Sequence, residues 1–264
     1  MCVTSRPAAI SRTSVFTLVT DEIRGGQPLH VTGYQNQVTN MSKTPNCMFL
    51  HFPCTDDIQL VDGPQLTTNL MSHITGSLPA VVDFPRTRGF RGLDPKPVLK
   101  YGDYDVVVAD DPGKILAAIE GVAQNRRPVV DDAFEHMVNW YWSRFPDYSF
   151  VLACFSGTVN PTHPIVVSYV PHSDDVVFAP GLDSHNGRLP VIGQLTTRDF
   201  RVAFGKSGVK LPINVRGLVG DWWAPQTVTG FYDNRSEGAN KDYVLAIDDL
   251  GVGQPGADLL RYCF

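Results

Sequence analysis

The sequence predicts an α+β fold that is β-rich, with one or more largely antiparallel sheets and two or three helices packed on one face. Glycine and proline are frequent, at 23 and 20 of 264 residues, and their even spread favours many turns and short strands. The predicted elements run as strands, then two helices, then strands, without the regular alternation of a doubly wound parallel sheet. Hydrophobic residues make up 43% of the chain, which is typical of a globular protein with a core.

The first half is predicted to consist mainly of strands. Residues 29–38 alternate between polar and apolar with a period of roughly two. Residues 47–52 form a short, almost wholly apolar strand that Pro53 closes. In this strand Cys47, Phe49 and His51 are expected to share one face, because successive side chains of a strand point to opposite sides.

A short helix is predicted over residues 65–74, where apolar residues recur every four positions. The segment 83–97 that follows holds three prolines, two glycines and four basic residues, which indicates a loop. We therefore expect either a single domain over residues 1–264 or two subdomains with a boundary near 83–97. Residues 98–109 are then predicted to form one or two strands.

Two helices are predicted next. Asp111 as N-cap and Pro112 at the first helical position are favoured start signals for the first of them. The second is predicted to begin at Asp132, with Glu135 three residues later as a relative of the capping box. It is expected to stop before Pro146, because the residue before a proline avoids the helical conformation.

The second half returns to a strand pattern, punctuated by Asn-Pro and Asn-Gly turn signals. The strands predicted there are 150–155, 165–170, 176–179, 201–204, 213–219, 228–231 and 243–247.

The densest group of chemistry-bearing residues lies in the segment 163–187. His172, Asp174 and Asp175 follow a predicted strand, and Asp183 and His185 come after the next short strand. Imidazole and carboxylate are common ligands of zinc and other first-row metals. The five residues therefore predict a divalent-metal site that would activate water for hydrolysis. The alternative, which we favour from the sequence, is two core strands joined by ordinary polar turns.

The same segment carries a short motif match. Residues 171–175 read PHSDD and resemble the HPDD-type metal motif of the LmbE-like deacetylases, which implies metal binding. The resemblance covers five residues, with Ser173 in place of the proline and Val176 in place of the usual following acid. The motif also lies late in this chain, whereas that family carries it after the first strand. We do not assign the family on this match.

Cysteine nucleophiles are a further hypothesis. Cys154 ends an apolar strand, and His163 or His172 is a candidate base for it. The alternative is a buried core cysteine, which is the commoner situation in such a strand. Cys2 ranks below Cys154. Removal of Met1 would leave an N-terminal thiol with its own amine as base, as in the N-terminal nucleophile hydrolases, although the residues after Cys2 do not resemble their motifs.

The loop 84–91 is a candidate anion-binding patch. Arg86, Arg88 and Arg91 interleave there with Phe84 and Phe90. Guanidinium groups bind phosphate or carboxylate, and aromatic rings stack on bases. A solvated surface loop is the alternative.

Charge and cysteine usage limit the classes of function. The net charge of −5 argues against a general nucleic-acid binder, so nucleic acid is expected only at the 84–91 loop. No apolar run approaches the ~18 residues of a membrane span, and no leader peptide is recognised. The five scattered cysteines lack a CxxC pair, which favours reduced thiols and a cytoplasmic location. Sparse charge favours self-association.

The sequence is compatible with two classes of function. No phosphate loop, strand-linked GxGxxG, HExxH or GxSxG motif is recognised. We favour a soluble β-rich binding, assembly or structural protein without a standard catalytic signature. The alternative is a metal-dependent hydrolase centred on the His172, Asp174, Asp175, Asp183 and His185 segment, with a divalent metal ion as cofactor. The sequence does not decide whether the protein is an enzyme.

Overall fold

The computed structural model describes residues 2–54, 58–60, 98–159, 164–197, 200–207, 226–234 and 237–247. Within these ranges the fold is β-rich, with mostly antiparallel sheets and two α-helices, as the sequence predicts. The predicted helix 65–74, the boundary loop 83–97 and the predicted strand 213–219 lie outside the described residues. None of the described helices is long and apolar enough to cross a membrane.

One sheet has five antiparallel strands in the order β1-β4-β8-β7-β6. Its strands are β1 (Val3–Thr4), β4 (Asn46–Phe52), β6 (Leu99–Tyr101), β7 (Tyr104–Ala109) and β8 (Ser149–Phe155). Every residue of β4, β7 and β8 is buried. Burial on both faces explains why these segments read as almost continuous apolar runs in the sequence.

A larger sheet has the order β14-β13-β2-β3-β10-β5, with β9 pairing onto β3. Its strands are β2 (Ala8–Arg24), β3 (Gln27–Asn40), β5 (Gln59–Leu60), β9 (Thr158–Val159), β10 (Ile165–Tyr169), β13 (Phe200–Ser207) and β14 (Gln226–Asn234). The long β2–β3 hairpin turns through Gly25 and Gly26, whose φ angles are +62° and +88°. Positive φ at both central residues is the requirement of a type I′ hairpin turn, which glycine meets without strain. β13 pairs with β2 in parallel, unlike the other pairs of the sheet.

Two small antiparallel sheets complete the described strands. β11 (Val176–Ala179) pairs with β16 (Tyr243–Ala246), and β12 (Leu195–Thr197) pairs with β15 (Glu237–Ala239). The first of these pairs brings the segment after β11 next to residues 240–242, which positions the candidate site described below.

The helical part lies between β7 and β8 in the chain. A 3₁₀ turn η1 (Pro112–Lys114) leads into α2 (Ile115–Glu120), and α3 (Asp132–Arg144) follows. The helix α3 begins at Asp132, as the sequence predicts, whereas the predicted capping box would make Asp132 the cap itself. The structure corrects this by one residue, because the Asp131 carboxylate accepts the backbone N–H of Phe134 at 3.1 Å.

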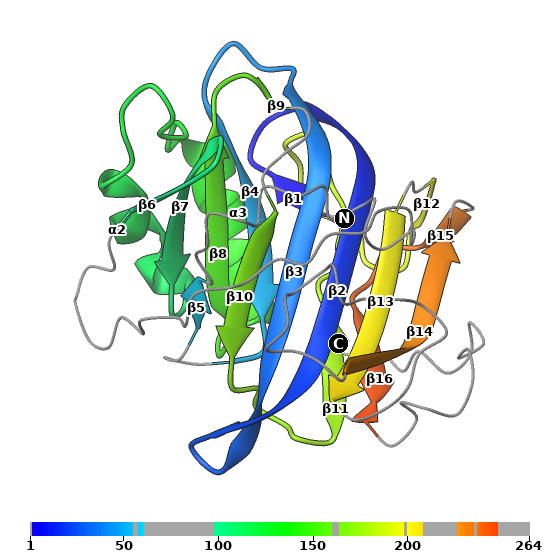
Figure 1. Ribbon diagram of the computed structural model, residues 1–264. Coiled ribbons are helices and arrows are strands. Elements are labelled where there is room, and N and C mark those ends of the chain that lie inside the picture. The colour runs from blue at the N-terminus through cyan, green and yellow to red at the C-terminus, as the bar shows by residue number, and fades with distance from the viewer. Residues whose placement is uncertain are drawn as a thin grey trace.

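The core has two layers, one on each face of the five-stranded sheet. On β4, Met48 and Leu50 belong to the cluster between the two sheets, whereas Cys47 and Phe49 belong to the cluster under α2 and α3. The predicted sharing of one face by Cys47 and Phe49 is thus confirmed. The layers follow as helices, five-stranded sheet and seven-stranded sheet, with β2 and β3 crossing the front of the molecule in Figure 1 and the helices on the far side of β7 and β8.

Candidate functional site

The site is built on the segment 181–188, which runs from β11 to the tip of a polar turn. The Asp183 N–H donates to Asn240 Oδ1 at 2.8 Å, and Asn240 Nδ2 donates back to the Asp183 carbonyl at 2.8 Å. On its other side the segment pairs with the N-terminal strand. The Ser184 N–H donates to the Cys2 carbonyl at 3.0 Å, and Thr4 N–H donates to the Ser184 carbonyl at 2.8 Å. The segment therefore extends the five-stranded sheet beyond β1.

The turn at the end of this segment is fixed by its own side chains. Asn186 Oδ1 accepts the Arg188 N–H at 3.0 Å and the Ser184 hydroxyl at 3.1 Å. Gly187 has a φ of +73° and lies against the backbone of Ser5 and Arg6, so a Cβ at this position would be both strained and crowded. The Asn186-Gly187 turn that the sequence predicts is present, and it holds His185 in place.

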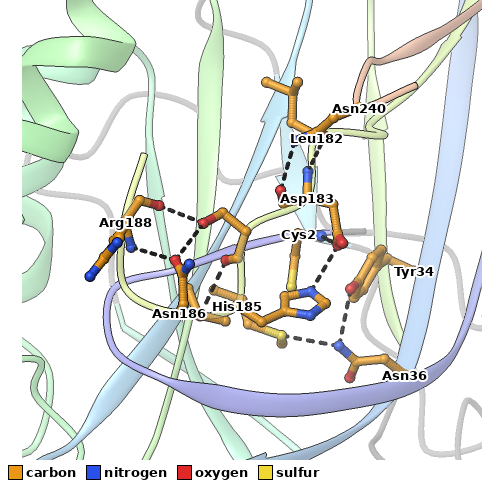
Figure 2. Close-up of polar contacts among 12 residues, drawn as sticks. Cys2, Tyr34, Asn36, Leu182, Asp183, His185, Asn186, Arg188 and Asn240 are labelled. Carbon is orange, nitrogen blue, oxygen red and sulfur yellow. Dashed lines mark hydrogen bonds and ion pairs between the residues drawn. The ribbon is translucent and has the colours of Figure 1, made fainter. Parts of the chain in front are cut away.

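These contacts bring together a thiol, an imidazole and a carboxylate. His185 Nε2 lies 2.8 Å from Asp183 Oδ1. The two groups form an ion pair, but their geometry does not meet the angular requirement of a hydrogen bond. The backbone N–H of Cys2 donates to the same carboxylate oxygen at 3.4 Å. Figure 2 shows the Cys2 side chain, the Asp183 carboxylate and the His185 ring turned toward one another.

The charges of the cluster reinforce one another. Burial disfavours the imidazolium, but the contacts with Asp183 and with the Cys2 thiol outweigh it and raise the pKa of His185 to about 9. Burial also opposes ionisation of Asp183, yet the positive charges of the amino terminus and of His185 lower the pKa of this carboxyl below its ordinary range. Near neutral pH the pair is therefore an imidazolium and a carboxylate.

Tyr34 on β3 completes the surroundings of the thiol. Its hydroxyl accepts a hydrogen bond from Asn36 Nδ2 at 3.0 Å. Burial, followed by the interaction with the Cys2 thiol, raises the pKa of Tyr34 well above its usual value. A neutral phenol that already accepts from Asn36 has its own O–H free to donate toward sulfur.

The exposed fractions differ within the cluster. The Cys2 residue is 2% exposed, whereas the side chains of Asp183 and His185 are 14% and 23% exposed. The imidazole is thus the member that solvent reaches most readily, and the thiol lies beneath it at the end of the two-sheet core.

The five residues predicted as metal ligands separate into two groups. Asp183 and His185 pair with each other, whereas the exposed His172 interacts through Nε2 with the Asp147 carbonyl at 2.7 Å. The His172 N–H donates to the Pro53 carbonyl, which follows the end of β4, and Asp174 and Asp175 are exposed. No group of three or more His, Cys, Asp or Glu residues suited to a metal occurs among the described residues.

The other residues that the sequence predicts as functional lie outside this cluster or outside the described residues. Cys154 is fully buried on β8, with Cys47 as a hydrogen-bonding neighbour. That hydrogen bond and burial raise the pKa of Cys154 well above its ordinary value, which works against a nucleophilic thiolate. His163, one of its two proposed bases, lies outside the described residues, as do Arg86, Arg88 and Arg91.

A second histidine–carboxylate pair lies in the core. His51 Nε2 is 2.9 Å from Asp242 Oδ2, and these side chains are 2% and 3% exposed. The other carboxylate oxygen, Oδ1, accepts the backbone N–H groups of Gly181 and Leu182 at 2.8 and 3.2 Å. The His51 ring is packed among Tyr and Phe rings. The sequence pointed to neither member of this pair as a functional residue.

No family model matches the chain, and comparisons with curated proteins and with solved structures also found no match.

Proposed function

We propose that the protein is a thiol-dependent hydrolase of acyl compounds, with Cys2 as its nucleophile. The observation that carries this proposal is the convergence of Cys2, His185 and Asp183 from two distant parts of the chain. A nucleophile, a base and a group that orients the base form the arrangement on which covalent acyl transfer depends, whatever fold holds it.

Each residue has a defined role in the proposal. In its neutral form His185 takes up the thiol proton, and the resulting imidazolium, which its raised pKa favours, then acts as the acid that protonates the leaving group. Asp183 stabilises the imidazolium and fixes its position, as the carboxylate of a catalytic triad does. Tyr34 is proposed to donate a hydrogen bond to the sulfur.

The reaction proceeds in two balanced steps. The Cys2 sulfur forms a bond to the acyl carbon, the bond from that carbon to the leaving oxygen or nitrogen breaks, and His185 returns a proton to the leaving group. Water then attacks the thioester, releases the carboxylic acid and restores the thiol. Because Cys2 is only 2% exposed, small acyl groups are the proposed substrates.

The experiment uses p-nitrophenyl acetate as the probe, with release of p-nitrophenolate and acetylation of Cys2 followed by peptide mass spectrometry. The purified protein is expected to acetylate at Cys2 and then turn over. Cys2→Ala is expected to abolish both signals, and His185→Ala to lower the acylation rate by about 100-fold. Cys54→Ser is the matched control, since Cys54 is also buried and lies outside the cluster. Equal rates for wild type and Cys2→Ala would overturn the proposal.

Reagent size gives a second readout of the same site. Iodoacetamide is expected to label Cys2 faster than a bulky maleimide does, and faster than it labels the fully buried Cys154. Asp183→Asn should slow this labelling, because it removes the charge that holds the imidazolium. Labelling of Cys2 that is unchanged in both Asp183→Asn and His185→Ala would show that the thiol is not activated.

A binding, assembly or structural role is the second candidate. It is supported by large apolar side chains that are exposed in the described structure, since such side chains favour contact with a partner. These residues are Ile23, Met41, Val129, Val130, Trp142, Val191 and Ile192. Light scattering tests self-association. A molar mass that rises with protein concentration and is lower in Trp142→Glu supports this role, and Glu120→Gln, at another exposed residue, is the control. A monomer at all concentrations argues against it.

The metal-dependent hydrolase remains a separate prediction. Of its five expected ligands, Asp183 and His185 are in contact. Metal analysis of protein purified without chelator tests it. About one equivalent of bound metal that is lost in His185→Ala would support the prediction, and metal far below one equivalent would remove it.

A further inference from the structure

Cys47 and Cys154 lie directly opposite each other on the two central strands of the five-stranded sheet. The register of β4 and β8 pairs them, both are free thiols, and both are fully buried. Both side chains belong to the cluster under the helices. They therefore point to the same face of the sheet, and the two thiols interact with each other.

The backbone shows which kind of antiparallel pair they form. The Cys47 N–H donates to the Ser5 hydroxyl at 3.1 Å, and the Cys47 carbonyl accepts the Ser5 N–H at 3.0 Å. Both backbone groups of Cys47 thus face β1, because a strand residue directs its N–H and C=O to the same side. β8 lies on the opposite side of β4, so Cys47 and Cys154 form a non-hydrogen-bonded pair.

This type of pair has the spacing that a disulfide needs. Opposite Cα atoms in a non-hydrogen-bonded pair are about 4.5 Å apart, and the side chains approach more closely than in the other type. A disulfide spans Cα separations of about 4.4–6.8 Å. The two sulfurs can therefore be bridged with little movement of the backbone.

We propose that Cys47 and Cys154 form a reversible cross-strand disulfide, so that the centre of the five-stranded sheet is a redox-modification site. The oxidant is a low-molecular-weight disulfide such as oxidised glutathione. One cysteine thiolate attacks it and releases one reduced glutathione, and the second cysteine then displaces the other. Two protein thiols are oxidised, one glutathione disulfide is reduced to two thiols, and the two protons pass to the released thiolates.

Burial sets the rate of this exchange. The hydrogen bond to Cys47 and the buried environment raise the pKa of Cys154, so the Cys154 thiolate is rare in the closed fold, and both sulfurs are shielded from solvent. Oxidation and reduction are therefore slow in the native state and are accelerated when β4 and β8 open locally. The inference is independent of the proposed hydrolase function, because it uses neither Cys2 nor His185.

The experiment counts thiols in the full-length protein. The reduced protein, which has five cysteines, is held in oxidised glutathione both in buffer and in urea below the unfolding midpoint, and thiols are then measured after complete unfolding. A loss of two thiols in at least one arm is expected, with a cross-linked peptide that joins Cys47 to Cys154. Reduction with dithiothreitol is expected to restore all five.

Variants locate the bond. Cys47→Ala and Cys154→Ala are each expected to lose the internal cross-link, whereas Cys54→Ser, which changes another buried thiol, is expected to keep it. The double variant Cys47→Ala/Cys154→Ala tests folding without either sulfur, by circular dichroism. Five remaining thiols in both arms, or a cross-link that joins other cysteines, would overturn the proposal.

Discussion

The protein contains two histidine–aspartate pairs that have nearly the same nitrogen–oxygen distance but very different surroundings. The His51–Asp242 pair measures 2.9 Å and is almost fully buried, with its second carboxylate oxygen bound by two backbone N–H groups. The His185–Asp183 pair measures 2.8 Å, is partly exposed and touches a thiol. The first pair holds three parts of the core together, and the second has a reactive neighbour. The contact distance alone therefore does not indicate function.

The largest effect is expected from breaking the core pair. Asp242→Ala would leave His51 unpaired and the N–H groups of Gly181 and Leu182 without their acceptor. Breaking a buried pair costs about 3–5 kcal/mol, so we expect a loss of this size in the free energy of unfolding, measured in urea. The matched variant is Asp183→Ala, for which a smaller loss is expected. If Asp183→Ala lost more unfolding free energy than Asp242→Ala, the His51–Asp242 pair would not be the one that stabilises the core.

The next effect concerns His30, a histidine without a carboxylate partner. It is buried on β3, and neither ring nitrogen has a hydrogen-bond partner in the described structure. Burial lowers the pKa of His30 to about 4, whereas the unfolded chain has a value of about 6.5. Between these values the unfolded state binds a proton that the folded state does not, so acid favours unfolding.

We therefore expect a loss of about 3 kcal/mol that begins below pH ~6.5 and is complete near pH ~4. Unfolding free energies from pH 7 to pH 4 should show this loss in the wild type and not in His30→Leu. Parallel pH curves for the two proteins would show that His30 does not account for the acid sensitivity.

In the partly exposed His185–Asp183 pair, His185 should show the opposite dependence on pH. The raised pKa of His185, about 9, means that its stabilisation is complete below pH ~6.5 and is lost as the pH rises through about 9. The lowered pKa of Asp183 means that its stabilisation is present above pH ~4 and is lost in stronger acid. Asp183→Asn is expected to cost roughly 2 kcal/mol near pH 6 and much less above pH 9. A cost that is constant from pH 6 to pH 9.5 would contradict this ion pair.

The smallest effect is expected at an exposed carboxylate. Asp131 caps α3 and also pairs with Arg6, and its side chain is 44% exposed. Asp131→Ala is expected to cost about 1 kcal/mol, mainly through loss of the cap, and thermal unfolding measures it. Arg6→Gln should cost less than Asp131→Ala, since exposed ion pairs contribute little. If Arg6→Gln destabilised the protein as much as Asp131→Ala or more, the stabilisation would come from the Arg6–Asp131 ion pair and not from the helix cap.

The sequence predicted the local elements better than their partners. The strands 150–155 and 176–179 and the start of α3 agree with the structure to within a residue, because turn residues and caps mark their ends. β2 was missed over its whole length, Ala8–Arg24. It lies between β3 and β13 and residues 13–20 are buried, so it lacks the alternation that reveals a strand with one exposed face.

The candidate site shows the same limit. Asp183 and His185 stand out by residue type, and the sequence identified both as chemistry-bearing residues. Their association with Cys2 spans 181 positions and depends on the pairing of residues 182–186 with the N-terminal strand. No local pattern contains that information. The sequence therefore ranked Cys154 above Cys2 as a candidate nucleophile, because Cys154 ends an apolar strand and His163 or His172 follows it in the chain.

The parallel pairing of β2 with β13 also determines when this protein can complete its fold. Phe200 lies opposite Thr13 in that pair, so one edge of β2 has no partner until the chain has been synthesised past residue 200. Contacts of such large sequence separation form slowly, and an open strand edge promotes association between chains. The thiol–imidazole–carboxylate cluster likewise joins Cys2 to residues 183 and 185, which are distant in the sequence. A nascent chain therefore carries Cys2 without Asp183 and His185 until residue 185 has been synthesised, so this site cannot form before that point.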